Sequence, residues 1–195
     1  MDIKQTAIKF LGAAALACTA LSASATTTVV NFDDLQGDGQ VANGYGGINW
    51  QNNWMYYSDS QDPYNPASGA ERIYVNYSTN QSWFSFDNAV VFDGAAVAGV
   101  PTGWGYGTGF VSFSLYYQGN LVSTSAQIDP SQTPTFLSSG YSGLVDSVHV
   151  NGSNDYYVLD DVTYSTAAVP EPENVALMLA GLALVGGMAR RARKA

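Results

Sequence analysis

The sequence has few cysteine, histidine and basic residues, and each shortage excludes a class of site. Its 195 residues include one cysteine, one histidine and seven lysines or arginines in total. Cys18 lies in an N-terminal segment that we expect to be cleaved off, so the rest of the chain forms no disulfide. A zinc or copper site needs several histidines or cysteines, and the chain does not have them.

The few basic residues are concentrated near the two ends. Lys4 and Lys9 lie near the N-terminus and four more lie between Arg190 and Lys194, so the region between carries only Arg72. Thirteen acidic residues accompany this arginine, which gives residues 26–166 a formal charge of about −12. Such a surface repels phosphate backbones, which excludes nucleic acid as a partner. It favours divalent cations or neutral ligands.

The first 25 residues have the three parts of a secretory signal peptide. Lys4 and Lys9 give a positive start, residues 10–21 are apolar, and Ala23-Ser24-Ala25 is a small-residue cleavage pattern. The sequence therefore predicts an N-terminal signal helix that signal peptidase removes between Ala25 and Thr26. An uncleaved N-terminal anchor is the alternative, disfavoured because the apolar stretch is short.

Catalytic motifs are scarce as well. His149 is expected in a strand, and the chain contains no Gly-x-Ser-x-Gly nucleophile elbow, so a serine triad is not indicated. Residues 103–109 alternate glycine with other residues but lack the Gly-x-Gly-x-x-Gly spacing of a nucleotide loop. A carboxylate pair for glycoside hydrolysis stays open, because thirteen acids are available and the sequence singles out no pair.

What the chain has in abundance is strand-forming and turn-forming residues. Tyrosine, valine, threonine and other strand formers fill short segments between turns, and residues 26–166 show no helical period. The sequence predicts an all-β domain over 26–166, a β-sandwich of the jelly-roll kind with about ten strands. We expect these strands at 27–33, 48–57, 72–77, 82–86, 90–100, 109–117, 121–128, 134–138, 145–150 and 156–164.

Two connections between strands are predicted in more detail. Gly119-Asn120 lies between two apolar runs and favours a two-residue hairpin turn, because such turns need positive φ. Residues 59–69 contain Pro63 and Pro66 and favour a long surface loop.

Aromatic side chains are the first candidates for ligand binding. Aromatic faces stack on the apolar C–H faces of sugars, while Asn and Asp side chains bond the hydroxyl groups. Trp104 and Tyr106 alternate with glycines, which leaves their rings uncovered if the segment is extended. Many of the aromatics must fill the core. The candidates for glycan binding are Trp50, Trp54, Trp83, Trp104 and Tyr106.

Two pairs of aspartates are the candidates for a structural calcium site. Asp33 and Asp34 lie at the end of the first expected strand, while Asp160 and Asp161 lie in the last. The first and last strands of a jelly roll commonly lie together, so the pairs could converge, and clustered carboxylates are ligands that Ca²⁺ takes. The alternative is that all four face solvent. Adjacent residues on a regular strand point to opposite faces, so at most one of each pair could bind the ion.

Residues 167–195 are predicted to form a linker and a sorting tail. Pro170-Glu171-Pro172 is followed by an apolar run at 175–189, expected to be a helix, and by a basic cluster at 190–194. As a helix the fifteen-residue run is about 22 Å long, shorter than the ~30 Å hydrocarbon core of a bilayer, so it is a marginal membrane segment. The basic cluster is expected to stay cytoplasmic, which leaves the β-domain outside.

This three-part tail resembles the PEP-CTERM sorting signal of Gram-negative bacteria, a signal also named after ice-binding proteins. The resemblance implies recognition by an exosortase-type membrane peptidase, cleavage near Pro170-Glu171-Pro172, and delivery to the cell envelope or extracellular matrix. The segments Phe32–Leu35, Tyr45–Trp50, Tyr141–Val148 and Tyr157–Val162 resemble galactose-binding jelly rolls.

The sequence thus predicts an exported, non-enzymatic protein of the cell surface. Its β-sandwich is expected to bind extracellular polysaccharide or to be a structural component of an exopolysaccharide matrix. The alternative is an enzyme that acts on polysaccharide through a carboxylate pair.

Overall fold

A computed structural model describes residues 25–51, 53–76, 82–105, 109–152, 156–166 and 172–192. The predictions on the signal helix, Cys18, Tyr106, Pro170 and Glu171 therefore lie outside the described residues. The chain divides into two compact units, Thr26–Ala167 and the two terminal segments taken together. Each unit is described by itself.

The unit Thr26–Ala167 is built from antiparallel strands, as the abundance of β-branched and aromatic residues predicts. Two short 3₁₀ turns, η2 (Tyr45–Gly47) and η3 (Thr102–Trp104), interrupt the strands. The strands are β1 (Thr27–Val30), β2 (Gly39–Gln40), β3 (Asn49–Trp50), β4 (Trp54–Tyr57), β5 (Arg72–Val75), β6 (Ser82–Gly99), β7 (Val111–Tyr117), β8 (Asn120–Thr124), β9 (Thr135–Ser138), β10 (Val145–Gly152) and β11 (Tyr157–Thr166).

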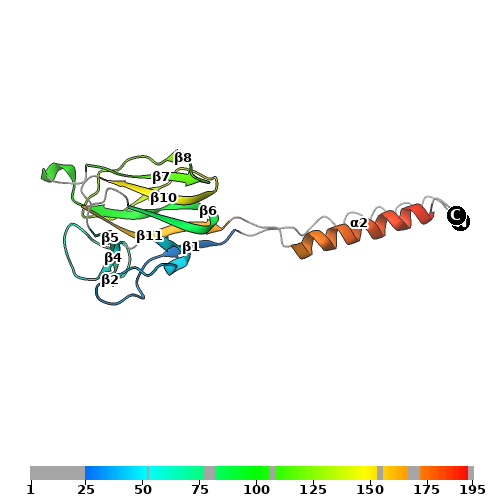
Figure 1. Cartoon of the computed structure of the whole chain (residues 1–195), viewed down its shortest axis with the longest axis horizontal. Coiled ribbons are helices and arrows are strands. Elements are labelled where there is room, and N and C mark those ends of the chain that lie inside the picture. Colours follow the sequence, from blue (N-terminus) through cyan, green and yellow to red (C-terminus); the bar gives the residue numbers. More distant parts are fainter. Residues whose placement is uncertain are drawn as a thin grey trace. The chain divides into compact units, whose positions relative to one another are not determined.

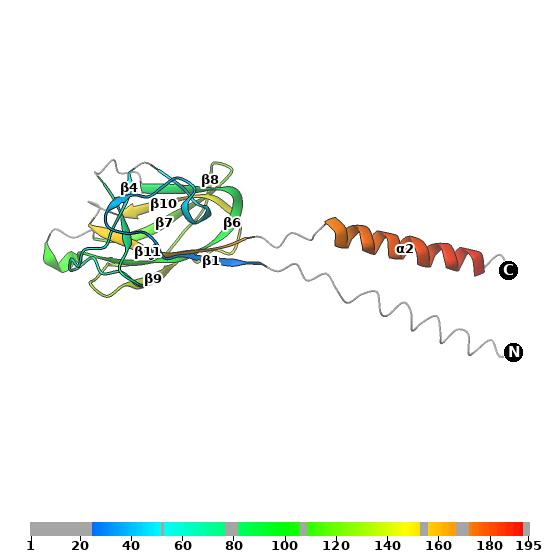
Figure 2. The same ribbon diagram turned by 90° about the horizontal axis from the view of Figure 1, so that it is seen from below.

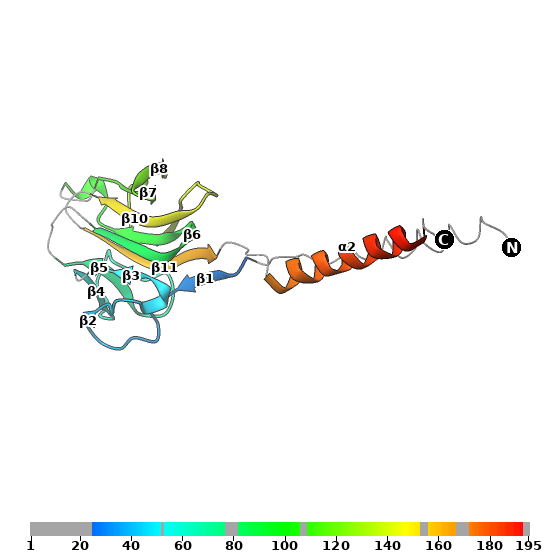
Figure 3. The same cartoon turned by 45° about the vertical axis from the view of Figure 1, so that its right-hand side comes forward.

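The long strand β6 joins the two layers of this unit. Along one of its edges it pairs with β3 and then with β11, and along the other with β10 and then with β9. The strand order is β2-β4-β5-β11-β6-β10-β7-β8. Figure 3 shows β7, β8 and β10 in one layer and β1, β2, β4 and β5 in the other. The sequence predicts two strands here, 82–86 and 90–100, but the backbone continues as one strand through the exposed Asp87 and Asn88.

The first strand pairs with the last, as expected for a jelly roll. Val30 of β1 lies opposite Val162 of β11, and Thr27 lies opposite Ser165. Figure 1 shows β1 beside β11, and Figures 1 and 2 place η3 at the opposite end of the unit. The prediction of an all-β sandwich is confirmed, and the acid pairs that follow β1 and lie in β11 come from neighbouring strands.

The core lies between the layers and is lined by alternate residues of the strands. Phe84 and Phe92 of β6 are fully buried, and their ring centroids are 5.8 Å apart. Phe113 of β7 meets Phe92 edge to face at 5.2 Å. The alternation along β7, with Val111, Phe113 and Leu115 buried, follows the two-residue period of a strand.

The predicted hairpin is present, but its turn is one residue earlier than expected. Gln118 and Gly119 are the two turn residues, with φ of 51° and 76°, and Tyr117 pairs with Asn120. A two-residue hairpin turn of this type needs positive φ at both central positions. The amide group of Asn120 donates to the carbonyl of Gln118 at 3.2 Å and so bridges the turn.

The segment 58–71 connects β4 to β5 and is the long loop that the sequence predicts. Ile73 of β5 lies opposite Leu159 of β11, and both side chains are buried in the core. Arg72 and Tyr74 therefore point to the other face of β5, and Asp160 points to the other face of β11. Arg72 and Asp160 are nevertheless 1% and 2% exposed, because residues of the loop pack over them and form hydrogen bonds with them.

The unit made of the two terminal segments contains one described helix, α2 (Pro172–Ala192). It begins three residues earlier than the predicted helix 175–189 and includes Arg190 and Arg191 of the basic cluster in its last turn. Among the residues that the structure describes, no helix is both long and apolar enough to cross a membrane.

Candidate functional site

Two of the four tryptophans proposed as ligand contacts are core residues. Trp50 and Trp54 are 3% and 0% exposed, and their rings meet edge to face at 5.5 Å. Both indole N–H groups are satisfied inside the protein, by the carbonyls of Tyr45 at 2.9 Å and Trp83 at 3.0 Å. Neither ring can offer a face to an external sugar, so the prediction for Trp50 and Trp54 is corrected.

The other two tryptophans reach the surface to different degrees. Trp83 is half-buried on the outer face of β6 and stacks on His149 of β10, with ring centroids 5.9 Å apart. The His149 ring also contacts Tyr116 at 4.5 Å, and partial burial lowers its pKa. Trp104 is 46% exposed, but it lies in the 3₁₀ turn η3 and not in the extended segment that the alternation predicts.

Asp33, Asp160 and Asp161 lie against the same loop, whereas Asp34 contacts Tyr45. The two backbone N–H groups of Ala67 and Ser68 donate to Oδ2 of Asp160, at 2.8 and 2.9 Å. Ser68 Oγ donates to Asp161 at 3.0 Å, and the Asp33 carboxylate lies directly against Gly69. Residues from both ends of the domain therefore fix the end of the loop.

These aspartates accept hydrogen bonds from protein groups. Asp34 accepts a hydrogen bond from the Tyr45 hydroxyl, and Asp33 accepts one from Asn31 at 2.9 Å. Among the described residues, no group of three or more His, Cys, Asp or Glu side chains is placed to hold a metal ion. Calcium binding stays a prediction, without a ready ligand set from Asp33, Asp34, Asp160 and Asp161.

Asp160 is a buried carboxyl group. Burial raises the pKa of Asp160 to about 7, against the lowering effect of its hydrogen bonds from the N–H groups of Ser68, Asp161 and Ala67. The residue that follows, Asp161, has a positive φ of 47°. The N–H of Asp161 donates to Oδ1 of Asp160 at 2.7 Å. Asp160 is thus a fixed acceptor for the loop 58–71.

Arg72 holds the other parts of the same loop. Its guanidinium donates to the carbonyl of Ala70 at 3.0 Å, to that of Tyr57 at 3.4 Å, and to that of Asp59. The guanidinium carbon lies 3.7 Å from the centre of the Tyr57 ring, a cation–π contact. The one cation of the β-domain therefore does not reach the surface but fixes both ends of the loop.

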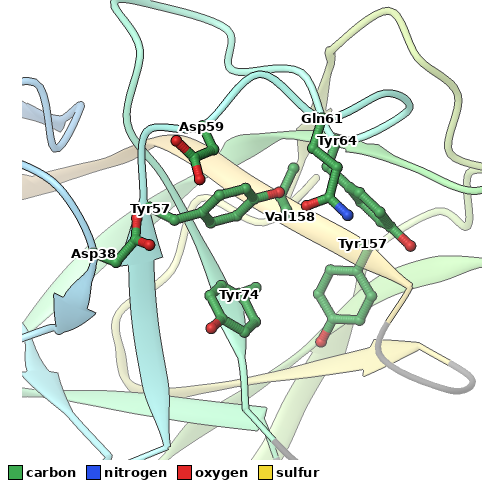
Figure 4. Close-up of a pocket in the computed structure, with 8 residues that line it drawn as sticks. All are labelled: Asp38, Tyr57, Asp59, Gln61, Tyr64, Tyr74, Tyr157 and Val158. Atoms are coloured by element: carbon green, nitrogen blue, oxygen red, sulfur yellow. The ribbon is translucent and has the colours of Figure 1, made fainter.

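A cavity of about 390 Å³ lies beside these anchored residues and is the candidate site. Tyr57 and Tyr74 come from β4 and β5, and Tyr157 and Val158 come from β11. The remaining lining residues are Asp38, which precedes β2, and Asp59, Gln61 and Tyr64 of the loop. In Figure 4, Tyr57 crosses the middle of the cavity, with Asp38 and Asp59 toward one end and Gln61, Tyr64 and Tyr157 toward the other.

The cavity has an aromatic interior and a polar rim. The rings of Tyr57 and Tyr74 are half-buried and meet edge to face at 5.3 Å. Burial raises the pKa of Tyr57, against the opposing effect of Arg72, so its hydroxyl is a stable hydrogen-bond donor. Asp38, Asp59 and Gln61 are exposed. Such a site offers flat apolar faces together with acceptors for hydroxyl or amine groups.

The sequence contained a signal for part of this cavity. Tyr57 lies three residues after Trp54, and the apolar Ile73 and Val75 flank Tyr74. A tyrosine on the polar side of a two-residue alternation lies on the outer face of its strand. The signal does not show that a loop covers this face, nor that Tyr157 joins it from a strand distant in the sequence.

Comparisons with known proteins give only a distant structural likeness. No family model and no curated protein matches the chain. A solved carbohydrate-binding module of family 29 is 11% identical, with a TM-score of 0.43 over 73% of this chain and 90% of that one. A variant of such a module complexed with cellulohexaose is 12% identical, with a TM-score of 0.42 over 73% of this chain and 92% of that one. Likenesses of this size do not show what the present chain binds.

Proposed function

We propose that this chain is an exported, non-catalytic surface protein whose β-sandwich binds glycan in the tyrosine cavity. The observation that carries this proposal is the lining of the cavity, four tyrosines together with two aspartates and a glutamine. Sugars present apolar C–H faces and hydroxyl edges, and this set of side chains complements both. The anchored loop supports the proposal, because a preorganised site loses less entropy on binding.

The charge of the domain favours glycans without negative groups. Residues 26–166 carry a formal charge of about −12, and their one arginine is buried. Asp38 and Asp59 place two carboxylates at the cavity itself. A sulfated or uronic-acid chain is therefore repelled both at long range and in the site.

The alternative function, cleavage of polysaccharide by a carboxylate pair, is favoured by one observation. Asp38 and Asp59 line the same cavity, as a hydrolytic pair must. A binding protein needs the same two groups only as hydrogen-bond acceptors. The two functions differ in whether new reducing ends appear.

The test is a binding and release assay with the full chain. Calorimetric titration with soluble β-linked glucose oligosaccharides and with uronic-acid oligosaccharides is expected to show heat of binding for the first set only. Incubation with the neutral set is expected to release no reducing ends. Binding of neither set contradicts the proposal, and release that is lost in an Asp38→Asn or Asp59→Asn variant establishes the enzyme instead.

We also propose that the two termini direct export and sorting. Signal peptidase is expected to cut between Ala25 and Thr26, and an exosortase-type peptidase near Pro170-Glu171-Pro172, leaving the domain in the envelope or extracellular matrix of a Gram-negative bacterium. The three-part tail supports this proposal. Mass spectrometry of the extracellular form should recover no peptide from 175–194, and an intact C-terminus there would contradict tail cleavage.

A further inference from the structure

The cavity has an electrostatic character that neutral glycan binding leaves unused. Its described lining contains two carboxylates and four tyrosine rings but no lysine, arginine or histidine. In Figure 4 both carboxylates lie toward the same end, on either side of the Tyr57 backbone and ring. Their negative charge is therefore concentrated at one part of the site.

Arg72 offsets only part of this charge, because its single positive charge stands against two carboxylates. Its guanidinium is 1% exposed and directed to the carbonyls of Tyr57, Asp59 and Ala70. It lies over one face of the Tyr57 ring, so this face already holds a cation and a ligand would contact the other tyrosine rings. The Asp59 carboxylate remains exposed although the Asp59 carbonyl accepts from Arg72.

Aromatic rings and carboxylates together are the groups that bind an organic cation. The negative faces of tyrosine rings attract an ammonium group, and nearby carboxylates accept its hydrogen bonds. Both attractions are weak at an exposed site but add when they act on one ligand group. A sugar ring with a free amine fits this arrangement better than one with a hydroxyl at the same position.

We infer that the ligand of this cavity is an amine-bearing glycan, a chain that contains unacetylated amino-sugar units, with the ammonium group held by Asp38 and Asp59. This inference rests on the proposed glycan-binding function and names its ligand class. The tyrosine rings stack on the sugar, and the carboxylates select the amine.

The experiment compares three oligosaccharides of equal length and linkage, built from glucose, N-acetylglucosamine or glucosamine. They share one backbone and differ only in a hydroxyl, an acetamido or an ammonium group on the second carbon. At low ionic strength the full chain is expected to bind the glucosamine oligomer about tenfold more tightly than the glucose oligomer. The preference is expected to shrink in high salt and at a pH that deprotonates the amine.

Two charge-matched double variants localise the effect. Asp38→Asn with Asp59→Asn keeps the size and hydrogen-bonding capacity of the rim and should abolish the preference. Asp87→Asn with Asp129→Asn removes the same charge from exposed positions outside the cavity lining and should keep it.

Each outcome decides the matter. Loss of the preference in the cavity variant alone supports the inference. An equal loss in both variants overturns it, because the overall charge then explains the preference. Equal binding of glucose and glucosamine oligomers overturns it as well but leaves the proposed function standing. If none of the three oligosaccharides binds, both the inference and the proposed function fail.

Discussion

Trp54 and Tyr57 lie three residues apart on β4, yet they belong to regions with opposite roles. Trp54 is fully buried among Trp50 and Phe84, and its N–H is satisfied by a backbone carbonyl. Tyr57 faces the other side of the strand, packs on Arg72 and lines a cavity. The two side chains alternate across the strand, so strand parity, and not residue type, separates an aromatic that stabilises the fold from one that can bind a ligand.

Removal of the core ring is expected to have the largest effect on the protein. Trp54→Ala should lower the free energy of unfolding by about 3–5 kcal/mol, because a large buried ring leaves a cavity that its neighbours cannot fill. Chemical denaturation of the variant measures this loss. A change below about 1 kcal/mol would show that the region is not a tightly packed core.

Arg72 shares a property with each region. It is buried like a core residue, but it contacts Tyr57 and Asp59, which line the cavity. Arg72→Met should lower the free energy of unfolding by about 2–3 kcal/mol, since three carbonyls lose a charged donor. It should also weaken glycan binding, because Tyr57 and Asp59 lose their support. Arg72→Lys is the matched control. Lysine keeps the charge without the fork of donors. The stability and glycan affinity of this variant should therefore lie between those of the unmodified protein and Arg72→Met. Unchanged binding by a folded Arg72→Met variant would show that the loop needs no anchor.

Asp160 gives the loop a pH-dependent anchor. The folded protein holds the Asp160 proton up to about pH 7, and the unfolded chain loses it near the ordinary pKa of 3.8. The folded state therefore binds more protons between these values, and its stability should fall as the pH rises through this window. The slope is at most about 1.4 kcal/mol per pH unit, the limit for one proton.

Melting curves between pH 4 and pH 8 test this prediction, with the window taken from the same two pKa values. Asp160→Asn should remove the contribution of this residue to the slope of stability against pH. It should also lower stability, because an amide nitrogen cannot accept from the loop N–H groups. Asp161→Asn leaves Asp160 in place and should keep the slope. A slope that survives Asp160→Asn would assign the effect to other groups.

The sequence predicts the fold better than the site, and particular residues show why. The positive-φ requirement places a hairpin within one residue of Gln118-Gly119, and prolines locate the loop after β4. The convergence of Asp33 and Asp160 follows from a general rule for jelly rolls. These predictions depend on local conformation or on a fold-level rule, so one sequence is enough.

The cavity as a whole could not be predicted, because it depends on which face of the sheet a loop covers. Trp50 and Trp54 were expected at a ligand surface and are core residues, since nothing local distinguishes an inward from an outward tryptophan on a short strand. Tyr74 and Tyr157 meet only because β5 pairs with β11. That pairing is a tertiary fact with no local signature.

The assignment of glycan binding to the tyrosine cavity is tested by measuring glycan affinity and melting temperature for Tyr74→Ala and Trp104→Ala side by side. Tyr74 lines the cavity, and Trp104 is exposed in η3 and is not among its lining residues. With the oligosaccharide that binds the unmodified chain, Tyr74→Ala should lose about 1–3 kcal/mol of binding free energy while remaining folded. Trp104→Ala should bind normally. Undiminished binding by a folded Tyr74→Ala variant, with a loss in Trp104→Ala, would contradict the assignment of the site to the cavity.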